Sequence, residues 1–225
     1  MIHTIIFDIG GTLVNARSSL ISFSERLTPD NNLDLRKQLL EFLIKEFMKI
    51  YRQENPPKFI GIKEIVAIIL RKAADKFDVK DLSGRAHELY GEAYLNSANL
   101  FDDTIPTLKK LKENGLKLIV ASDADPDVLD DELSTFKIYQ YFDELVISGN
   151  IGAYKPSDKM TNAILDKCDQ PYSDILFVGD TEVDILAAKK IGAKSILIKR
   201  NGDFSIKADY CITDLNEIFD IIKNH

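Results

Sequence analysis

Four polar residues stand at the ends of apolar stretches of the chain, and their types suit chemistry on a phosphoryl group. They are Asp8, Ser122, Lys155 and Asp180, and a second carboxylate, Asp184, follows the last of them. A carboxylate such as Asp8 can attack phosphorus and carry the group as an acyl phosphate, which splits one hard displacement into two easier ones. Ser122 can donate to a phosphate oxygen, and Lys155 supplies positive charge where negative charge develops.

The segment GDTEVD contains Asp180 and Asp184 and offers oxygen ligands of the kind that Mg²⁺ prefers. Each candidate also has an ordinary structural explanation. Ser122 could cap a helix, Lys155 could lie on the surface, and the two aspartates could interact with a helix N-terminus. Their joint occurrence at successive strand ends favours chemistry over these separate explanations.

The elements before these residues are predicted to form one sheet. The apolar run that ends at Phe7 predicts a buried strand, closed by Asp8 and the pair Gly10 and Gly11. Further strands are predicted at residues 116–121, 145–147, 175–178, 195–198 and 210–212, and helices at 107–114, 126–136, 157–168, 183–191 and 215–222. Strands that alternate with helices indicate a doubly wound parallel sheet, an α/β fold in which polar residues at the carboxyl ends converge on one edge.

A long helical segment interrupts this alternation after the first strand. Apolar residues recur at helical spacing over residues 20–27, 33–51, 62–77 and 82–95, with a break at Asn55-Pro56-Pro57. The segment is too long for a simple crossover between strands. We therefore predict an all-helical domain at residues 15–98, inserted into an α/β core made of residues 1–14 and 99–225.

Composition places the chain among ordinary globular proteins and argues against several classes of partner. It has 225 residues, of which 45% are hydrophobic and 29% charged. The apolar stretch at residues 65–70 is far too short to cross a bilayer, and the beginning lacks the pattern of a signal peptide, so we expect a cytoplasmic protein with no membrane partner. The net charge of −7 argues against a nucleic-acid partner. Cys168 and Cys211 lack CxxC spacing and are predicted to be buried free thiols.

Taken in order, the polar motifs resemble those of the haloacid dehalogenase superfamily. Its first motif, a strand followed by DxDGT, corresponds to FDIGGTL, and its second, a strand that ends in Ser or Thr, corresponds to LIVAS. Its lysine motif corresponds to GAYKPS and its acidic motif to VGDTEVD. The resemblance covers residues 1–14 and 99–225 and implies a Rossmann-like core, and the helical insertion resembles the cap domain that many members carry there.

The resemblance implies a role for each residue at the strand ends. Asp8 is implied as the nucleophile, Ser122 as a ligand of the transferring phosphoryl group, and Lys155 as the residue that holds both together. Asp180 is implied as a direct Mg²⁺ ligand. Asp184 is expected either to contribute to the metal site through water or to brace Lys155.

The loop after the nucleophile is implied to complete the site. Asp8 and the main-chain carbonyl of Gly10 are expected to ligand the metal, while Gly11 and Thr12 shape the loop around the phosphoryl group. The implied activity is a Mg²⁺-dependent phosphatase that acts on a small phosphorylated metabolite.

Gly10 departs from the pattern of the family's phosphatases, which usually carry an aspartate there as general acid and base. Such a group typically contributes about 10²–10⁴-fold to the rate. Three interpretations are open: substrates with good leaving groups, replacement by another carboxylate, and weak or absent catalysis. Asp123, beside Ser122, is the first candidate for replacement, although an acid next to a helix start is its simpler explanation.

Two other activities of the superfamily fit less well. Its true dehalogenases need no metal, so the retention of Asp180 and Asp184 argues against dehalogenation. Phosphonate hydrolysis normally uses a cap lysine, and none of the lysines at residues 15–98 is singled out by the sequence. The alternative from a different class is a phosphate- and metal-binding protein without turnover, which acts through cap closure or a partner.

Overall fold

The computed structural model describes residues 1–16, 19–29, 32–53, 58–169, 172–200, 202 and 205–224. The chain divides into two compact units, which we describe separately. The core unit consists of Met1–Asn15 and Asn99–His225, and the helical unit consists of Ala16–Ala98. All of the candidate site residues belong to the core unit.

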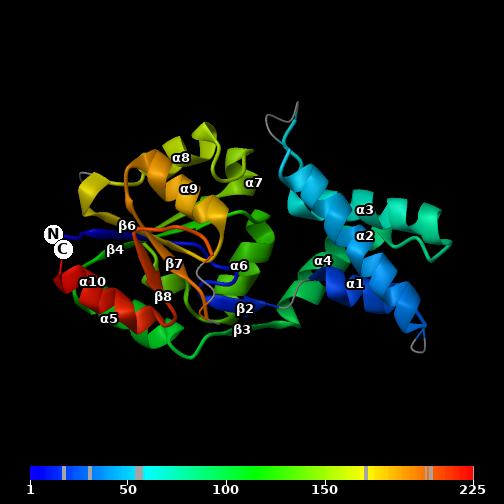
Figure 1. The fold of residues 1–225 in the computed structure, drawn as a ribbon, viewed down its shortest axis with the longest axis horizontal. Helices are drawn as coiled ribbons and strands as arrows, with labels where there is room; N and C mark the ends of the chain where they lie inside the picture. Colours follow the sequence, from blue (N-terminus) through cyan, green and yellow to red (C-terminus); the bar gives the residue numbers. More distant parts are fainter. Residues whose placement is uncertain are drawn as a thin grey trace. The chain divides into compact units, whose positions relative to one another are not determined.

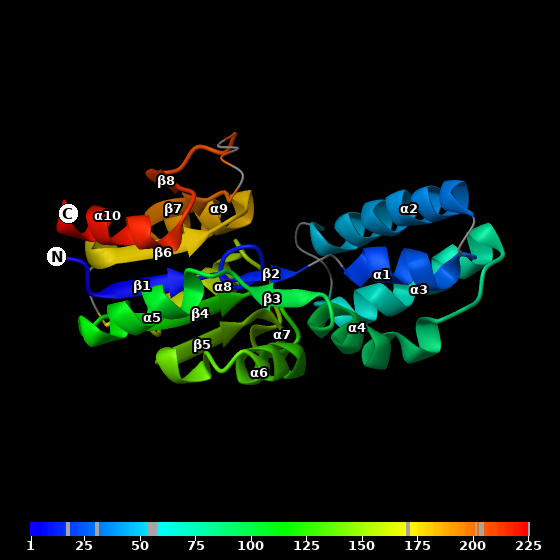
Figure 2. The same cartoon turned by 90° about the horizontal axis from the view of Figure 1, so that it is seen from below.

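A sheet of parallel strands forms the centre of the core unit (Figures 1 and 2). Its strands, in spatial order, are β5 (Glu144–Ile147), β4 (Lys117–Ser122), β1 (Thr4–Phe7), β6 (Ile175–Gly179), β7 (Lys194–Ile198) and β8 (Tyr210–Ile212). Every neighbouring pair is parallel. The predicted α/β fold class is confirmed.

The register of the three central strands brings their carboxyl ends level. Phe7 of β1 pairs with Val120 of β4 on one side and with Val178 of β6 on the other. All four residues of β1 are buried, as its β-branched and aromatic composition predicts. Asp8, Ser122 and the end of β6 therefore come to the same edge of the sheet.

Helices cover both faces of this sheet. On one face, α8 and α9 pack Met160, Ile164 and Ile191 against Ile6 and Phe177. On the opposite face lie α5 and α10 (Figures 1 and 2). The helices of the core unit are α5 (Thr104–Glu113), α6 (Pro126–Thr135), α7 (Ser148–Ile151), α8 (Asp158–Leu165), α9 (Glu182–Ile191) and α10 (Ile218–Lys223), with 3₁₀ turns η2 (Tyr139–Tyr141), η3 (Tyr172–Asp174) and η4 (Leu215–Glu217).

The helical unit is built from amphipathic helices. They are α1 (Ser19–Leu27), α2 (Leu33–Tyr51), α3 (Ile62–Phe77) and α4 (Ala86–Leu95), with the 3₁₀ turn η1 (Ser83–Arg85) before the last. Leu39 and Leu43 of α2 and Ile65 and Ile69 of α3 are fully buried, as their helical spacing predicts. The predicted break at Asn55-Pro56-Pro57 lies outside the described residues.

A second, two-stranded sheet marks the places where the chain leaves and re-enters the core unit. It pairs β2 (Val14–Ala16) with β3 (Ala98–Leu100). Neither strand is predicted from the sequence, because three residues are too few to show the alternation that identifies a strand.

Several predicted details need correction. Helix α5 begins at Thr104, three residues earlier than predicted, because Pro106 is tolerated in a first helical turn. Cys168 and Cys211 are free thiols, but the prediction that both are buried is wrong: Cys168 is half-buried and Cys211 is exposed. The reason is that Cys211 lies on β8, an edge strand. Among the described residues, no helix combines the length and apolar character that crossing a membrane requires.

Candidate active site

Asp8 occupies the first position after the central strand of the sheet. Its backbone N–H donates to the carbonyl of Val178 at 2.9 Å, and its side chain is only 12% exposed. The chain then turns sharply, because the carbonyl of Ile9 accepts the backbone N–H groups of three successive residues, Thr12, Leu13 and Val14. Asp8 is thus fixed between a strand and a hydrogen-bonded loop.

Lys155 links Asp8 to the acidic motif. Its Nζ donates to Asp8 Oδ1 at 2.7 Å, to Asp184 Oδ1 at 2.6 Å and to the carbonyl of Ala121 at 2.8 Å. The lysine side chain is 2% exposed, so these three acceptors replace its hydration. A lysine from the loop after α7 is thereby tied to β1, β4 and α9.

Burial and the neighbouring charges together set the pKa values of Asp8 and Lys155. Burial raises the pKa of Asp8 well above its ordinary value, although the charge of Lys155 opposes the shift. Burial alone would lower the pKa of Lys155, but Asp184 and Asp8 outweigh it and hold that pKa well above its usual range. Lys155 is therefore a permanent cation at neutral pH.

Asp184 makes several hydrogen bonds within the protein. Besides the bond to Lys155, its Oδ2 accepts from the backbone N–H of Thr181 at 3.0 Å and from Thr181 Oγ1 at 2.5 Å, which forms a capping box at the start of α9. Its side chain is 1% exposed. Each oxygen of Asp184 thus accepts at least one hydrogen bond from within the protein.

Two glycines make room for the acidic residues. A Cβ at Gly179 would lie 2.3 Å from Cβ of Asp184, and a Cβ at Gly11 would lie 2.3 Å from Oδ2 of Asp180. Gly11 also has a φ of +80°, a conformation that side-chain-bearing residues rarely adopt. Both positions therefore require glycine for the aspartates to approach.

The carboxylates of Asp8, Asp180 and Asp184 gather in a group that suits a cation. One ligand atom from each lies within 4.8 Å of the others. Asp180 Oδ1 is buried and has no hydrogen-bond partner among the described residues. Burial, reinforced by Asp184, raises the pKa of Asp180 to about 6. Three carboxylates against the single ammonium of Lys155 leave an excess of negative charge that a divalent cation would neutralise.

The remaining predicted residues lie around this cluster. Ser122 is the last residue of β4 and is buried. Asp123 is half-buried, and its Oδ1 accepts from the backbone N–H of Lys155 at 3.0 Å. Gly10 is exposed, while Thr12 is fully buried. All of the predicted site residues are therefore brought to the same edge of the sheet.

Sequence reasoning missed three residues with contacts to this region. Thr181 caps α9 and holds Asp184. Arg200 donates from Nη2 to the carbonyl of Thr12 at 2.9 Å, and Asp103 is the ion-pair partner of Arg200. Arg200 comes just after the predicted strand at 195–198, so the same rule that selected the other strand ends could have identified it.

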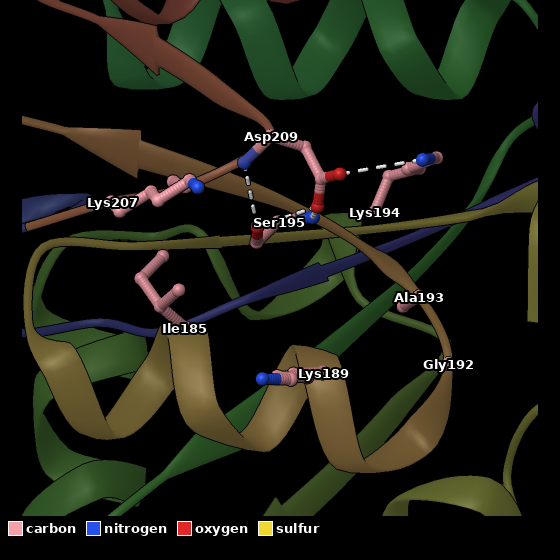
Figure 3. Close-up of a pocket in the computed structure, with 9 residues that line it drawn as sticks. Ile185, Lys189, Gly192, Ala193, Lys194, Ser195, Lys207 and Asp209 are labelled. Carbon is pink, nitrogen blue, oxygen red and sulfur yellow. Dashed lines mark hydrogen bonds and ion pairs between the residues drawn. The ribbon is translucent and has the colours of Figure 1, made fainter.

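A separate hollow in the core unit does not involve the cluster. It has a volume of about 460 Å³ and lies between α9, the start of β7 and the segment at residues 207–209 (Figure 3). None of the predicted site residues lines it. Within it, Asp209 accepts from the backbone N–H of Ser195 at 2.9 Å and from Ser195 Oγ at 2.7 Å, which joins this segment to β7.

Comparison with known proteins points to one family. The family model described as haloacid dehalogenase-like hydrolase matches residues 5–198 of the chain. Phosphoglycolate phosphatase of Aquifex aeolicus is 26% identical over 232 residues, which cover 99% of this chain and 98% of that protein. Pyrophosphatase PpaX of Bacillus mycoides is 22% identical over 230 residues, which cover 99% of this chain and 97% of that protein.

A solved structure agrees with the same fold. The crystal structure of an L-2-haloacid dehalogenase aligns with a TM-score of 0.78 over 99% of both chains, at 19% sequence identity. The match extends over the α/β sheet and the inserted helices together.

Proposed function

The chain belongs to the haloacid dehalogenase-like hydrolases, and from that premise we propose that it is a Mg²⁺-dependent phosphatase that hydrolyses a small phosphorylated metabolite. The observation that carries the proposal is the buried ammonium of Lys155, held between Asp8 and Asp184 beside the unpartnered oxygen of Asp180. Burying a lysine among carboxylates is costly, and a function at this edge of the sheet gives a reason for it.

Asp8 is proposed as the nucleophile. One carboxylate oxygen forms a bond to phosphorus as the bond from phosphorus to the leaving oxygen breaks, which gives an acyl phosphate on Asp8 and a leaving group that departs as an anion (alkoxide, phosphate or carboxylate) and takes any proton it needs from solvent. A water molecule then attacks the same phosphorus, which releases inorganic phosphate and restores Asp8. Lys155 contributes by fixing the Asp8 carboxylate through a 2.7 Å hydrogen bond and by offsetting negative charge in both steps.

The residues present fit a magnesium ion. Asp8, Asp180 and the main-chain carbonyl of Gly10 are proposed as its ligands, since Asp180 Oδ1 is buried without a partner among the described residues. Asp184 is proposed to act indirectly, because its oxygens already accept from Lys155 and Thr181. When bound, the ion would supply positive charge next to the phosphoryl oxygens.

Gly10 restricts the range of leaving groups that this site can hydrolyse efficiently. A glycine cannot protonate the leaving oxygen, so leaving groups that depart as stable anions are favoured, as from aryl or acyl phosphates and from phosphoric anhydrides. The relative named pyrophosphatase is consistent with an anhydride, whereas the relative named phosphoglycolate phosphatase is consistent with an alkyl ester. We propose that aryl phosphates, acyl phosphates and phosphoric anhydrides are the favoured substrates and that phosphate esters of alcohols react more slowly.

Hydrolysis of an aryl phosphate tests the proposal. We expect Asp8→Asn to lower kcat at least about 10³-fold and a chelator to abolish turnover. Asp158→Asn is the matched control, because the side chain of Asp158 is exposed and pairs with Lys190, which is also exposed. A panel of acyl, aryl and alkyl phosphates and pyrophosphate then ranks leaving groups. If no member of the panel shows turnover that depends on Asp8, the alternative of a phosphate- and metal-binding protein without turnover takes its place.

A further inference from the structure

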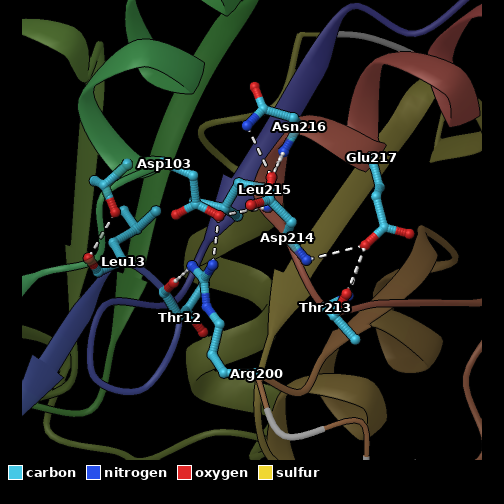
Figure 4. A network of polar contacts seen from close by, with 10 residues as sticks. Thr12, Leu13, Asp103, Arg200, Thr213, Asp214, Leu215, Asn216 and Glu217 are labelled. Atoms are coloured by element: carbon cyan, nitrogen blue, oxygen red, sulfur yellow. Dashed lines mark hydrogen bonds and ion pairs between the residues drawn. The ribbon is translucent and has the colours of Figure 1, made fainter.

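A partly buried ion pair, in which Asp103 is buried and Arg200 is half-buried, lies on the side of the core unit where the chain returns from the helical unit (Figure 4). Arg200 Nη1 donates to Asp103 Oδ2, and Arg200 Nη2 donates to the carbonyl of Thr12 at 2.9 Å. The guanidinium also stacks 4.0 Å from the ring centre of Phe101. Arginine suits this position because its planar fork can bind two acceptors while it stacks on an aromatic ring.

Asp103 ties the pair to a second element. Its Oδ2 also accepts from the backbone N–H of Leu215 at 2.8 Å, at the start of η4, and the residue is only 7% exposed. The pair therefore joins the end of β7, the segment before α5 and the start of η4 to the loop after Asp8. Ion pairs contribute little net stability at the surface, and buried ones are offset by the cost of desolvation, so this partly buried pair is better explained by the geometry that it imposes.

The loop held by Arg200 is the one that follows the proposed nucleophile. Its next carbonyl, that of Leu13, is held as well, by Thr104 Oγ1 at 2.7 Å and by the backbone N–H of Phe101 at 3.2 Å. The loop contains two consecutive glycines, Gly10 and Gly11, which have more conformational freedom than any other pair of residues. Besides the hydrogen bonds within the turn, these contacts hold the Thr12 and Leu13 carbonyls from outside it.

We propose that Arg200 and Asp103 are positioning residues that hold the carbonyl of Thr12 and thereby fix the Gly10–Thr12 turn next to Asp8. The kinetic part of this inference rests on the proposed phosphatase activity, whereas the structural part does not. Neither side chain is assigned a contact with substrate. Their effect passes through the backbone of the turn, whose Gly10 carbonyl is a proposed metal ligand.

Hydrogen exchange tests the structural part directly. In Arg200→Ala we expect the backbone amides of Thr12, Leu13 and Val14, which donate to Ile9, to exchange at least about 10-fold faster than in the wild type. Asp143→Asn is the matched control, since Asp143 likewise joins a cation, Lys112, to a backbone N–H, at the other end of β4. Unchanged exchange of the three amides in Arg200→Ala would overturn the proposal, as would equal acceleration in the control.

Kinetics test the consequence for catalysis. Below the melting temperature of each variant, we expect Arg200→Ala to lower kcat for an aryl phosphate about 10–100-fold and to change KM less than about 3-fold, because a displaced loop misaligns the reacting atoms. Asp143→Asn should lower the melting temperature with kcat unchanged. A fall in kcat as large in Asp143→Asn as in Arg200→Ala would contradict a role specific to this pair.

Two further comparisons cover the cases in which Arg200→Ala does not fold or the wild type shows no turnover that depends on Asp8. If Arg200→Ala does not fold, Arg200→Lys replaces it, because lysine keeps the charge opposite Asp103 but lacks the fork, and we then expect exchange about 3–10-fold faster than in the wild type. Exchange equal to that of the wild type in Arg200→Lys would then overturn the proposal. If the wild type shows no turnover that depends on Asp8, the phosphatase proposal fails while the exchange measurement still decides whether Arg200 fixes the turn.

Discussion

At the scale of single residues, the site depends on how two buried charges are satisfied. Lys155 reaches three acceptors with one ammonium, so its charge is compensated within the protein. Asp180 is in the opposite situation, because one of its oxygens is buried and has no partner among the described residues. The first arrangement compensates the cost of burying a charge, and the second leaves an oxygen whose desolvation is not compensated within the described residues.

Asp180 gives the metal-free protein a distinctive dependence of stability on pH. Its pKa is about 6 in the folded protein, because burial and Asp184 disfavour its charge, and about 3.9 in an unfolded chain. The folded state therefore keeps a proton that the unfolded state has lost. The free energy of unfolding contributed by Asp180 thus falls as pH rises from about 4 to about 6, by an amount on the order of 3 kcal/mol.

Urea unfolding of wild type and Asp180→Asn in the presence of a chelator measures this contribution. We expect Asp180→Asn to be the more stable protein at pH 7.5, and the difference to shrink as the pH is lowered to 4.5. Added Mg²⁺ should raise the melting temperature of the wild type and not that of the variant. If the free energy of unfolding depended on pH in the same way in both proteins, the folded structure would not raise the pKa of Asp180.

Asp123 offers a test of the missing acid and base. Because its Oδ1 accepts from the backbone N–H of Lys155, we expect it to position the lysine loop, a role that an asparagine oxygen can also perform. Asp123→Asn should therefore slow aryl and alkyl phosphates alike, by less than about 10-fold. The ratio of the two rates is the measurement. A loss confined to alkyl phosphates would instead make Asp123 the substitute for an aspartate at position 10.

At the scale of elements, the carboxyl end of β6 and the start of α9 act as one unit. The strand ends at Gly179, and the helix begins two residues after Asp180 with the capping box of Thr181 and Asp184. The Asp184 carboxylate, which accepts from Lys155, thus also forms part of the cap at the N-terminus of α9. A change that moves α9 away from β6 should affect stability and the site together.

Gly179→Ala is that change. Its Cβ would lie 2.3 Å from Cβ of Asp184, so the helix must shift, and we expect a destabilisation of about 1–3 kcal/mol together with a fall in kcat of at least about 10-fold. Gly84→Ala is the control, since no heavy atom lies within 4 Å of its Cβ. Thermal unfolding and aryl phosphate hydrolysis of both variants make the comparison. Retention of full activity in Gly179→Ala would show that the site tolerates movement of α9.

At the scale of the whole molecule, chemistry and substrate choice are expected to reside in different units. The candidate site lies entirely in the core unit. We propose that the helical unit, which resembles a cap domain, supplies contacts that select the substrate. The pairing of β2 with β3 brings the two crossing points of the chain side by side. The helical unit can therefore be removed by joining Ala16 to Ala98 through a short Gly-Ser linker.

We expect the joined core to fold and to lose selectivity. A large buried cluster that includes Ile6, Phe177 and Ile191 consists entirely of residues of the core unit, so circular dichroism should report an α/β protein that unfolds cooperatively. Hydrolysis of a small aryl phosphate should stay within about 10-fold of the full chain, while the ranking of metabolite substrates flattens. A joined core that ranks those substrates as the full chain does would place specificity in the core unit.

The sequence by itself determined the order of the core elements and the residues at their ends. Apolar runs closed by Asp8, Ser122 and Asp180 are local signals, and the rule that parallel strands share a functional edge needs no coordinates. The helices could also be predicted, because apolar residues recur at helical spacing within each single element. The short strands β2 and β3 were not, because their stability comes from pairing with each other.

Only the tertiary structure decided which polar groups form hydrogen bonds with each other. It assigns Asp184 to Lys155 and Thr181, and it assigns Asp123 to the backbone of Lys155. The pair of Arg200 and Asp103 is separated by 97 positions in the chain, so no local pattern relates them. Hydrogen bonds between such distant residues depend on the register and packing of whole elements, and a single sequence records the residues without recording those contacts.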